Sequence, residues 1–376
     1  MDITCATPLL GGLSPAAFMR RHWQKKPLLI RQAIPDLAPI VSRTQLFALA
    51  ARDEVESRLV VRDKRGWSVR QGPLPRRALP ALQRAEWTLL VQGLDLHVDA
   101  AHALLARFRF VPDARLDDVM VSFATDGGGV GPHVDSYDVF LLQVQGRRRW
   151  RIGRTVDASL VPEAPLKILA NFVAEEEWLL EPGDMLYLPP GWAHDGVAEG
   201  ECMTCSIGFQ AARRGDLGQQ VLQRLIDASE AHSGDPLYRD PRQAATAEPG
   251  LIPPTLQAFA IDAVQRSLAE PRLLACALGE VLSEPKPRVS FDAAVGLPLA
   301  GGVRLDRRTR MMYDAWHVFI NGESFRAGGR DAKLMRRLAD LRCLTALEMQ
   351  ALGGDARGLV GEWAEAGWLH AEPKLQ

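Results

Sequence analysis

The strongest constraint on this chain is a histidine and a carboxylate two residues apart, followed at a distance by a second histidine. His133-Val134-Asp135 comes after the glycine-rich run 127–131, and His194 ends the motif that begins at Pro182-Gly183-Asp184. Side chains at alternate positions of a strand point to one face, so His133 and Asp135 can reach the same metal ion. Two imidazoles and one carboxylate that leave other positions open are typical of non-haem iron(II) oxygenases. The motif predicts such a site.

The sequence around this motif changes from strands to helices. Short apolar runs separated by turn signals predict a β-rich region up to about residue 209, with a reverse turn at Gln145-Gly146 between strands 139–144 and 147–152. A helix is expected from Ser14 to about Lys26, because Ser14-Pro15 is a typical helix start. Helices are expected later at 216–231, 255–269 and 272–283. The prolines of 284–288 then predict a linker, because proline stops helix formation.

The overall composition is that of a globular protein with more than one domain. The chain has 376 residues, 47% hydrophobic and 24% charged, and its net charge of −1 argues against a general polyanion-binding protein. Five scattered cysteines suggest reduced thiols, and the single pair Cys202-x-x-Cys205 falls on opposite faces of a strand, which disfavours a zinc site. No signal peptide or long apolar run is evident, so we expect a cytoplasmic protein.

Two strands carry polar side chains that their alternation sends to defined faces. In strand 147–152, Arg148 shares a face with Trp150 and Ile152, so it is the arginine predicted to point inward. A buried arginine needs an anionic partner, although an exposed strand with a basic rim is an equally good interpretation of this stretch alone. In strand 117–126, Ser122 shares a face with Met120 and Asp118.

These motifs resemble a known family. The segments around His133 and His194 are similar to the cupin-like double-stranded β-helix of the Jumonji-C (JmjC) class of 2-oxoglutarate oxygenases. The runs 21–27, 127–133, 137–140 and 146–151 narrow the resemblance to the bacterial ribosomal oxygenases. The resemblance implies an α+β fold, with a helical middle segment and a C-terminal winged-helix-like module. It also implies hydroxylation of the β-carbon of an arginine in a large-subunit ribosomal protein.

The resemblance assigns roles to individual residues. His133, Asp135 and His194 would bind iron(II), Arg148 and Ser122 would bind the distal carboxylate of the cosubstrate 2-oxoglutarate, and dioxygen would be the second cosubstrate. The substrate arginine would enter a slot formed by Asp118, Met120, Tyr137 and Ser206. Alternatives for these four are a solvated strand end for Asp118, core packing for Met120 and Tyr137, and a hydrogen bond to backbone for Ser206. No further catalytic acid, base or nucleophile is expected.

The expected organisation has four parts. Residues 1–92 would support the barrel, 93–213 would form the JmjC domain, 214–288 would be helical and form a homodimer, and 289–376 would be the winged-helix-like module. Nucleic-acid binding by that module is disfavoured, because acidic residues balance its arginines. Two other functions stay open. One is the same chemistry on a histidine or methyl-lysine of another basic protein, and the other is a non-enzymatic, cupin-like metal-binding adaptor.

Overall fold

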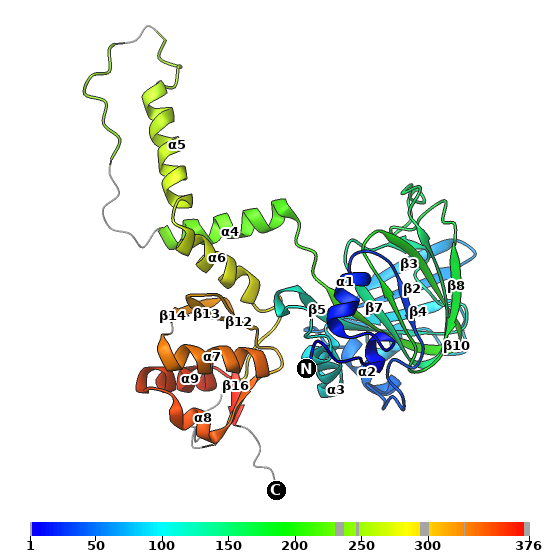
Figure 1. The fold of residues 1–376 in the computed structure, drawn as a ribbon. Coiled ribbons are helices and arrows are strands. Elements are labelled where there is room, and N and C mark those ends of the chain that lie inside the picture. The colour runs from blue at the N-terminus through cyan, green and yellow to red at the C-terminus, as the bar shows by residue number, and fades with distance from the viewer. Residues whose placement is uncertain (1, 230–236, 246–247, 294–300, 327, 372–376) are drawn as a thin grey trace. The chain divides into compact units, whose positions relative to one another are not determined.

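The chain forms two compact units, and each is described by itself. The computed structural model describes residues 2–229, 237–245, 248–293, 301–326 and 328–371. Its units are Met1–Ala211 and Ala212–Gln376 (Figure 1). The finer division into four parts stays a prediction. Among the described residues, none of the helices has both the length and the apolar character that a membrane crossing requires.

The first unit is built around a large antiparallel sheet. Its helices are α1 (Pro15–Arg21), α2 (Arg43–Ala50) and α3 (Asp99–Ala106). Its strands are β1 (Leu28–Ile30), β2 (Ser57–Asp63), β3 (Gly66–Gln71), β4 (Trp87–Val91), β5 (Leu116–Ala124), β6 (His133–Val134), β7 (Val139–Arg154), β8 (Glu176–Leu180), β9 (Met185–Leu188) and β10 (Trp192–Phe209).

Two long strands connect the two halves of the barrel. The strand order is β1-β9-β7-β10-β5-β4-β2-β3, with β6 paired to β10 and β8 paired to β7. Strand β10 pairs with β7 over most of its length, and with β6 near its start and β5 near its end. Strand β7 in turn pairs with β9 near its start and with β8 further along. This arrangement confirms the predicted double-stranded β-helix.

The reverse turn predicted at Gln145-Gly146 is wrong. Residues 139–154 form one continuous strand, and the pairing of β7 with β10 shifts register between Glu199 and Thr204, opposite this point. Gly146 has φ of +63°, and a Cβ there would lie 2.1 Å from the carbonyl oxygen of Glu201. The glycine therefore makes a β-bulge that bends the strand without reversing it.

Helix α1 ends earlier than predicted because the residues after it bond to the barrel. Ser14 caps the helix as expected, but the helix stops at Arg21, and Gln24 has a left-handed φ of +54°. The backbone N–H of Gln24 donates to Tyr187 Oη at 2.8 Å, and its side chain donates to Asp138 at 3.0 Å. Tyr187 Oη also donates to the fully buried Asp138 carboxylate at 2.6 Å. These bonds attach the N-terminal segment to the strands that carry the site.

The second unit contains the predicted helices and a small α+β module, whose winged-helix character is confirmed below. Its helices are α4 (Arg214–Ser229), α5 (Pro254–Leu268), α6 (Pro271–Ser283), α7 (Gly329–Leu341), α8 (Ala346–Ala351) and α9 (Gly354–Glu365). Its strands are β11 (Val303–Leu305), β12 (Met311–Tyr313), β13 (His317–Ile320), β14 (Glu323–Arg326), β15 (Cys343–Leu344) and β16 (Leu369–Ala371). Residues 230–231 of the first predicted helix lie outside the described residues. Helix α6 packs closely on β13, where a Cβ at Gly279 would meet the Phe319 ring.

Candidate active site

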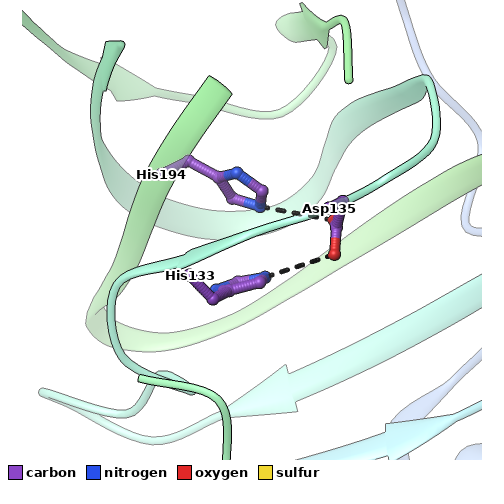
Figure 2. Close-up of side chains that lie close together, drawn as sticks. All are labelled: His133, Asp135 and His194. Atoms are coloured by element: carbon purple, nitrogen blue, oxygen red, sulfur yellow. Dashed lines mark ion pairs between the residues drawn. The ribbon is translucent and has the colours of Figure 1, made fainter. Parts of the chain in front are cut away.

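Three side chains converge at the start of β10. His133 lies on β6 directly opposite His194 on β10, and Asp135 follows β6 on the connection to β7. The Nε2 atoms of His133 and His194 lie 3.9 and 3.6 Å from the two carboxylate oxygens of Asp135. Figure 2 shows both imidazoles pointing at this carboxylate. One ligand atom from each residue lies within 4.8 Å of the others, so the three can hold a single metal ion.

Backbone hydrogen bonds orient both imidazoles. His133 Nδ1 lies 2.9 Å from the carbonyl oxygen of Gly131, and His194 Nδ1 lies 3.1 Å from that of Trp192. Carbonyl oxygens only accept hydrogen bonds, so each Nδ1 carries the proton and donates it. In a neutral imidazole this leaves the lone pair on Nε2, the atom that faces Asp135, and this is the tautomer that a metal ligand needs.

The protonation of His194 also suits metal binding. Burial lowers the pKa of His194 to about 4, and the neighbouring His133 acts in the same direction against the attraction of Asp135. The imidazole is therefore neutral near pH 7, and its lone pair is available. Two imidazoles and one carboxylate match the ligand set of iron(II) oxygenases.

A cavity of about 410 Å³ opens beside this cluster. Arg148, Ser122 and Trp150 line it together with the three potential metal ligands. The prediction that Arg148 points inward is confirmed, since the residue is 3% exposed, while on the other face Arg147 is exposed and Arg149 is half-buried. A cavity of this size lined by a few polar groups is typical of a small-molecule site.

Arg148 has the features of a residue that binds an anionic ligand. Its guanidinium donates to Ser122 Oγ and to the carbonyl oxygen of Gly196, both at 3.0 Å. Its buried Nε has no hydrogen-bond partner, and it forms no ion pair with any described residue. Burial lowers its pKa, but an arginine stays charged at neutral pH. A buried charge without a counter-ion is costly, so the site fits a ligand carboxylate.

The residues predicted to form the substrate slot are mostly brought together. Met120, Tyr137 and Ser206 line the cavity. Asp118 does not line it, and its Oδ2 accepts a hydrogen bond from the Gly93 N–H at 2.9 Å. The carboxylate nevertheless lies just behind the wall, because Gly208 lines the cavity and a Cβ there would be 3.6 Å from Asp118 Oδ1.

Tyr137 stays protonated at the mouth of this cavity. Partial burial, and then the negative charges of Asp135 and Asp118, raise the pKa of its hydroxyl. The side chain is 40% exposed and so can act as both an apolar wall and a hydrogen-bond donor. The roles of these four slot residues stay predictions.

Several lining residues were not singled out from the sequence. Arg58 comes from β2, Gln92 directly follows β4, and Lys167 comes from the connection between β7 and β8. Arg58 has a buried Nε without a partner and forms no ion pair with another described residue. Arg58 lies within the predicted β-rich region, but the sequence alone does not predict that its strand pairs with β4. Strand alternation alone could have predicted the face of the sheet on which Arg58 lies. It could not have predicted that this face borders the cavity.

The other metal-binding candidates do not form a site. Cys202 and Cys205 pack in different apolar clusters on opposite sides of β10, as predicted. Among the described residues, no group of three or more histidine, cysteine, aspartate or glutamate side chains other than the one at His133 could hold a metal ion. His22, His97 and His102, isolated in the sequence, do not belong to it.

Comparison with known proteins gives two domain matches. Residues 103–217 match the model of the JmjC domain, and residues 265–370 match that of the ROXA-like winged helix. The predicted fold class is confirmed by these matches together with the sheet topology. The winged-helix match includes α6, in agreement with the packing of this helix on β13.

Individual solved structures extend the similarity to most of the chain. The ribosomal protein uL16 3-hydroxylase of Escherichia coli (strain K12) is 38% identical over 242 residues, 63% of this chain and 62% of that protein. The crystal structure of Escherichia coli ribosomal oxygenase YcfD is 30% identical, with a TM-score of 0.79, and the match covers 94% of this chain and 97% of that one. The structure of YcfD from Escherichia coli with cobalt and 2-oxoglutarate is 28% identical in sequence, with a TM-score of 0.80. This match covers 96% of this chain and 99% of that one.

We predict that replacing either histidine of the cluster abolishes metal binding. His133→Ala and His194→Ala should each weaken Co(II) binding more than about 100-fold, since even the loss of an outer-sphere partner can cost that much. Calorimetry and the visible absorption of bound cobalt provide the measurement. His97→Ala serves as the control and should bind as the unaltered protein does. Unchanged binding in His194→Ala would contradict the assignment.

Proposed function

Because the chain belongs to the JmjC-domain ribosomal oxygenases, we propose that it is an iron(II)- and 2-oxoglutarate-dependent dioxygenase that hydroxylates the β-carbon of an arginine in a large-subunit ribosomal protein. The observation that carries the proposal is the buried, uncompensated Arg148 beside a cluster of two histidines and one aspartate. The similarity to a uL16 hydroxylase and to a structure with cobalt and 2-oxoglutarate supports it. Such a substrate also implies a cytoplasmic location.

The proposed chemistry depends mainly on binding and orientation. Bound iron(II), 2-oxoglutarate and dioxygen together supply the oxidising power, with succinate and carbon dioxide as coproducts. His133, Asp135 and His194 would occupy one face of the metal and leave the rest open. Arg148 and Ser122 would fix the distal carboxylate of 2-oxoglutarate through charge-assisted hydrogen bonds. The protein then needs only to hold the C–H bond of the substrate close to the metal.

The substrate guanidinium would lie against the outer part of the cavity. Met120 and Tyr137 offer apolar surface, while Asp118 and Ser206 offer hydrogen-bond acceptors near the Gly208 wall. A cation beside an aromatic face and a carboxylate is favourably placed. This combination favours arginine over a neutral side chain as the group that is held.

We predict that a ribosomal substrate gains one oxygen atom on an arginine. Purified large-subunit ribosomal proteins, uL16 included, should be incubated with the protein, iron(II), 2-oxoglutarate and air, followed by intact-mass and fragment analysis. The gain should disappear without 2-oxoglutarate. Oxygen on a histidine, or demethylation of a lysine, would reject the arginine substrate while keeping the chemistry. No succinate formation with any protein would favour the non-enzymatic adaptor.

We also predict that Arg148 determines the affinity for 2-oxoglutarate. Arg148→Met removes a charged partner worth about 1.5–3 kcal/mol, so the Kd should rise about 10-fold to 100-fold. Binding can be measured anaerobically by calorimetry with Mn(II) in place of iron. Arg149→Met is the matched control, because Arg149 is on the exposed face of the same strand and pairs with Glu177 and Glu199. Equal affinities in the two variants would remove Arg148 from the site.

A homodimer through the helical segment is the second part of the proposal. Helix α5 is exposed along its length, including Phe259 and Val264. A helix of 15 residues with exposed apolar side chains is marginal in water by itself, so these side chains need a partner surface.

We predict that charges on α5 convert the dimer to a monomer. Phe259→Asp combined with Val264→Asp should halve the mass measured by light scattering, because the carboxylates would be buried without partners. Leu347→Asp, which changes an exposed residue of α8 in the same unit, is the control and should stay dimeric. A double variant with the unaltered mass would place the interface elsewhere.

A further inference from the structure

The exposed apolar side chains of the first unit are concentrated beside the cavity. We call the connection between β7 and β8, residues 155–175, the β7–β8 segment. The large hydrophobic side chains that are exposed in the described part of this unit are Ile3, Tyr137, Val156, Leu160, Val161 and Val173. Four of these six belong to the β7–β8 segment, and Tyr137 lines the cavity. Scattered exposed apolar residues are normal, but a concentration of them marks an interaction site.

The β7–β8 segment is continuous with the cavity. Pro165, Leu166 and Lys167 line the cavity, and Leu160 and Val161 precede them in the same segment. A polypeptide that places one side chain in the cavity must extend over the residues around the opening. The exposed apolar side chains are therefore positioned to contact that polypeptide outside the slot.

The segment is an ordered hairpin and not a loose loop. Leu160 and Leu169 form a β-bridge, the Val161 N–H donates to the Ile168 carbonyl at 2.8 Å, and the Ala170 N–H donates to that of Ser159 at 2.9 Å. Its inner side is anchored, because Ile168 and Leu169 are buried. A preformed surface loses little conformational entropy on binding, which favours affinity.

The hairpin is attached directly to the metal cluster. The Leu169 N–H donates to the Pro132 carbonyl at 2.8 Å, immediately before His133. Ile168 packs against Gly131, where a Cβ would lie 3.3 Å from Ile168 Cγ1. A protein held by the outer side of the hairpin is thus held at a fixed position relative to the metal ligands.

The charge of the segment selects a basic partner. Asp157, Glu163 and Glu175 outnumber Lys167, so the segment is net negative. Glu163 is exposed and forms no ion pair with another described residue. A net negative segment beside the cavity attracts a positively charged protein and disfavours acidic ones.

We propose that the β7–β8 segment is a docking surface for the folded protein substrate, a basic protein whose arginine enters the cavity. The inference rests on the proposed function and adds a second recognition element to it. The slot selects the side chain, whereas the hairpin selects the protein that carries it. Substrate recognition is thereby divided between two parts of the substrate. The slot binds the short sequence around the arginine, and the hairpin binds a surface of the folded protein.

The test compares a folded substrate with a short peptide. Leu160→Ser combined with Val161→Ser removes two exposed apolar side chains that neither line the cavity nor pack in a core. The KM for folded uL16 should rise about tenfold, as expected from the loss of this much apolar contact. The KM for a synthetic peptide centred on the hydroxylated arginine should not change, and neither should the Kd for 2-oxoglutarate. Ile3→Ser, which changes a similarly exposed residue outside the segment, is the matched control.

The outcomes separate this inference from the proposed function. If the unaltered protein modifies uL16 and the double variant keeps its KM for that protein, the docking surface is wrong and the function stands. An equal rise in KM for protein and peptide would also overturn docking, because the change would then act on the slot. If the unaltered protein modifies neither uL16 nor the peptide, both proposals fail.

Discussion

The antiparallel pairing of β7 with β10 is the constraint on which the site depends. It places Ile152 opposite His194, Ala198 opposite Arg148, and Leu141 opposite Ser206 along one pair of strands. The bulge at Gly146 bends the pair, so both strands contribute to both halves of the barrel. This one pair of strands therefore sets the spacing between His194, Arg148 and Ser206. A register slip of one residue would turn Arg148 to the outside.

Arg148 is the residue at which the requirements of folding and of function conflict. Its immediate neighbours are Ser122 Oγ and a backbone carbonyl, which satisfy hydrogen bonds but do not neutralise its charge. On the outer face of the same strand, Arg149 and Arg151 pair with Glu199 and Asp195. The fold thus provides carboxylates for these two outer arginines, whereas no described residue provides one for the buried Arg148. That difference is understandable if the ligand brings the missing carboxylate.

Local rules predicted the parts of the site that depend on strand alternation. Period two placed Arg148 on the face of Trp150 and Ile152, although an exposed basic rim stayed an equal alternative, and it placed Met120 with Ser122. The His-x-Asp spacing paired His133 with Asp135. Arg58 and Lys167 could not be found this way, because they reach the cavity through strand order and through a long connection. The bulge at Gly146 was missed for another reason, since a glycine after a polar residue suits a turn and a bulge equally. The early end of α1 could not be predicted either, because it depends on the hydrogen bonds of Gln24 to Tyr187 and Asp138.

The side chains of the site are buried at the inner end of the cavity and exposed at its rim. This difference explains why the inner part could be predicted from the sequence more fully than the rim. At the inner end, Arg148 and His194 are buried and held by several bonds, so small ligands of fixed geometry suit them. At the rim, Tyr137 and the β7–β8 segment are exposed and offer broad apolar surface. The chemistry that a family shares is specified by a few buried groups, because these groups allow a bound ligand only one geometry. Choice of protein partner is specified by surface contacts, each weak by itself, so many sequences can provide them.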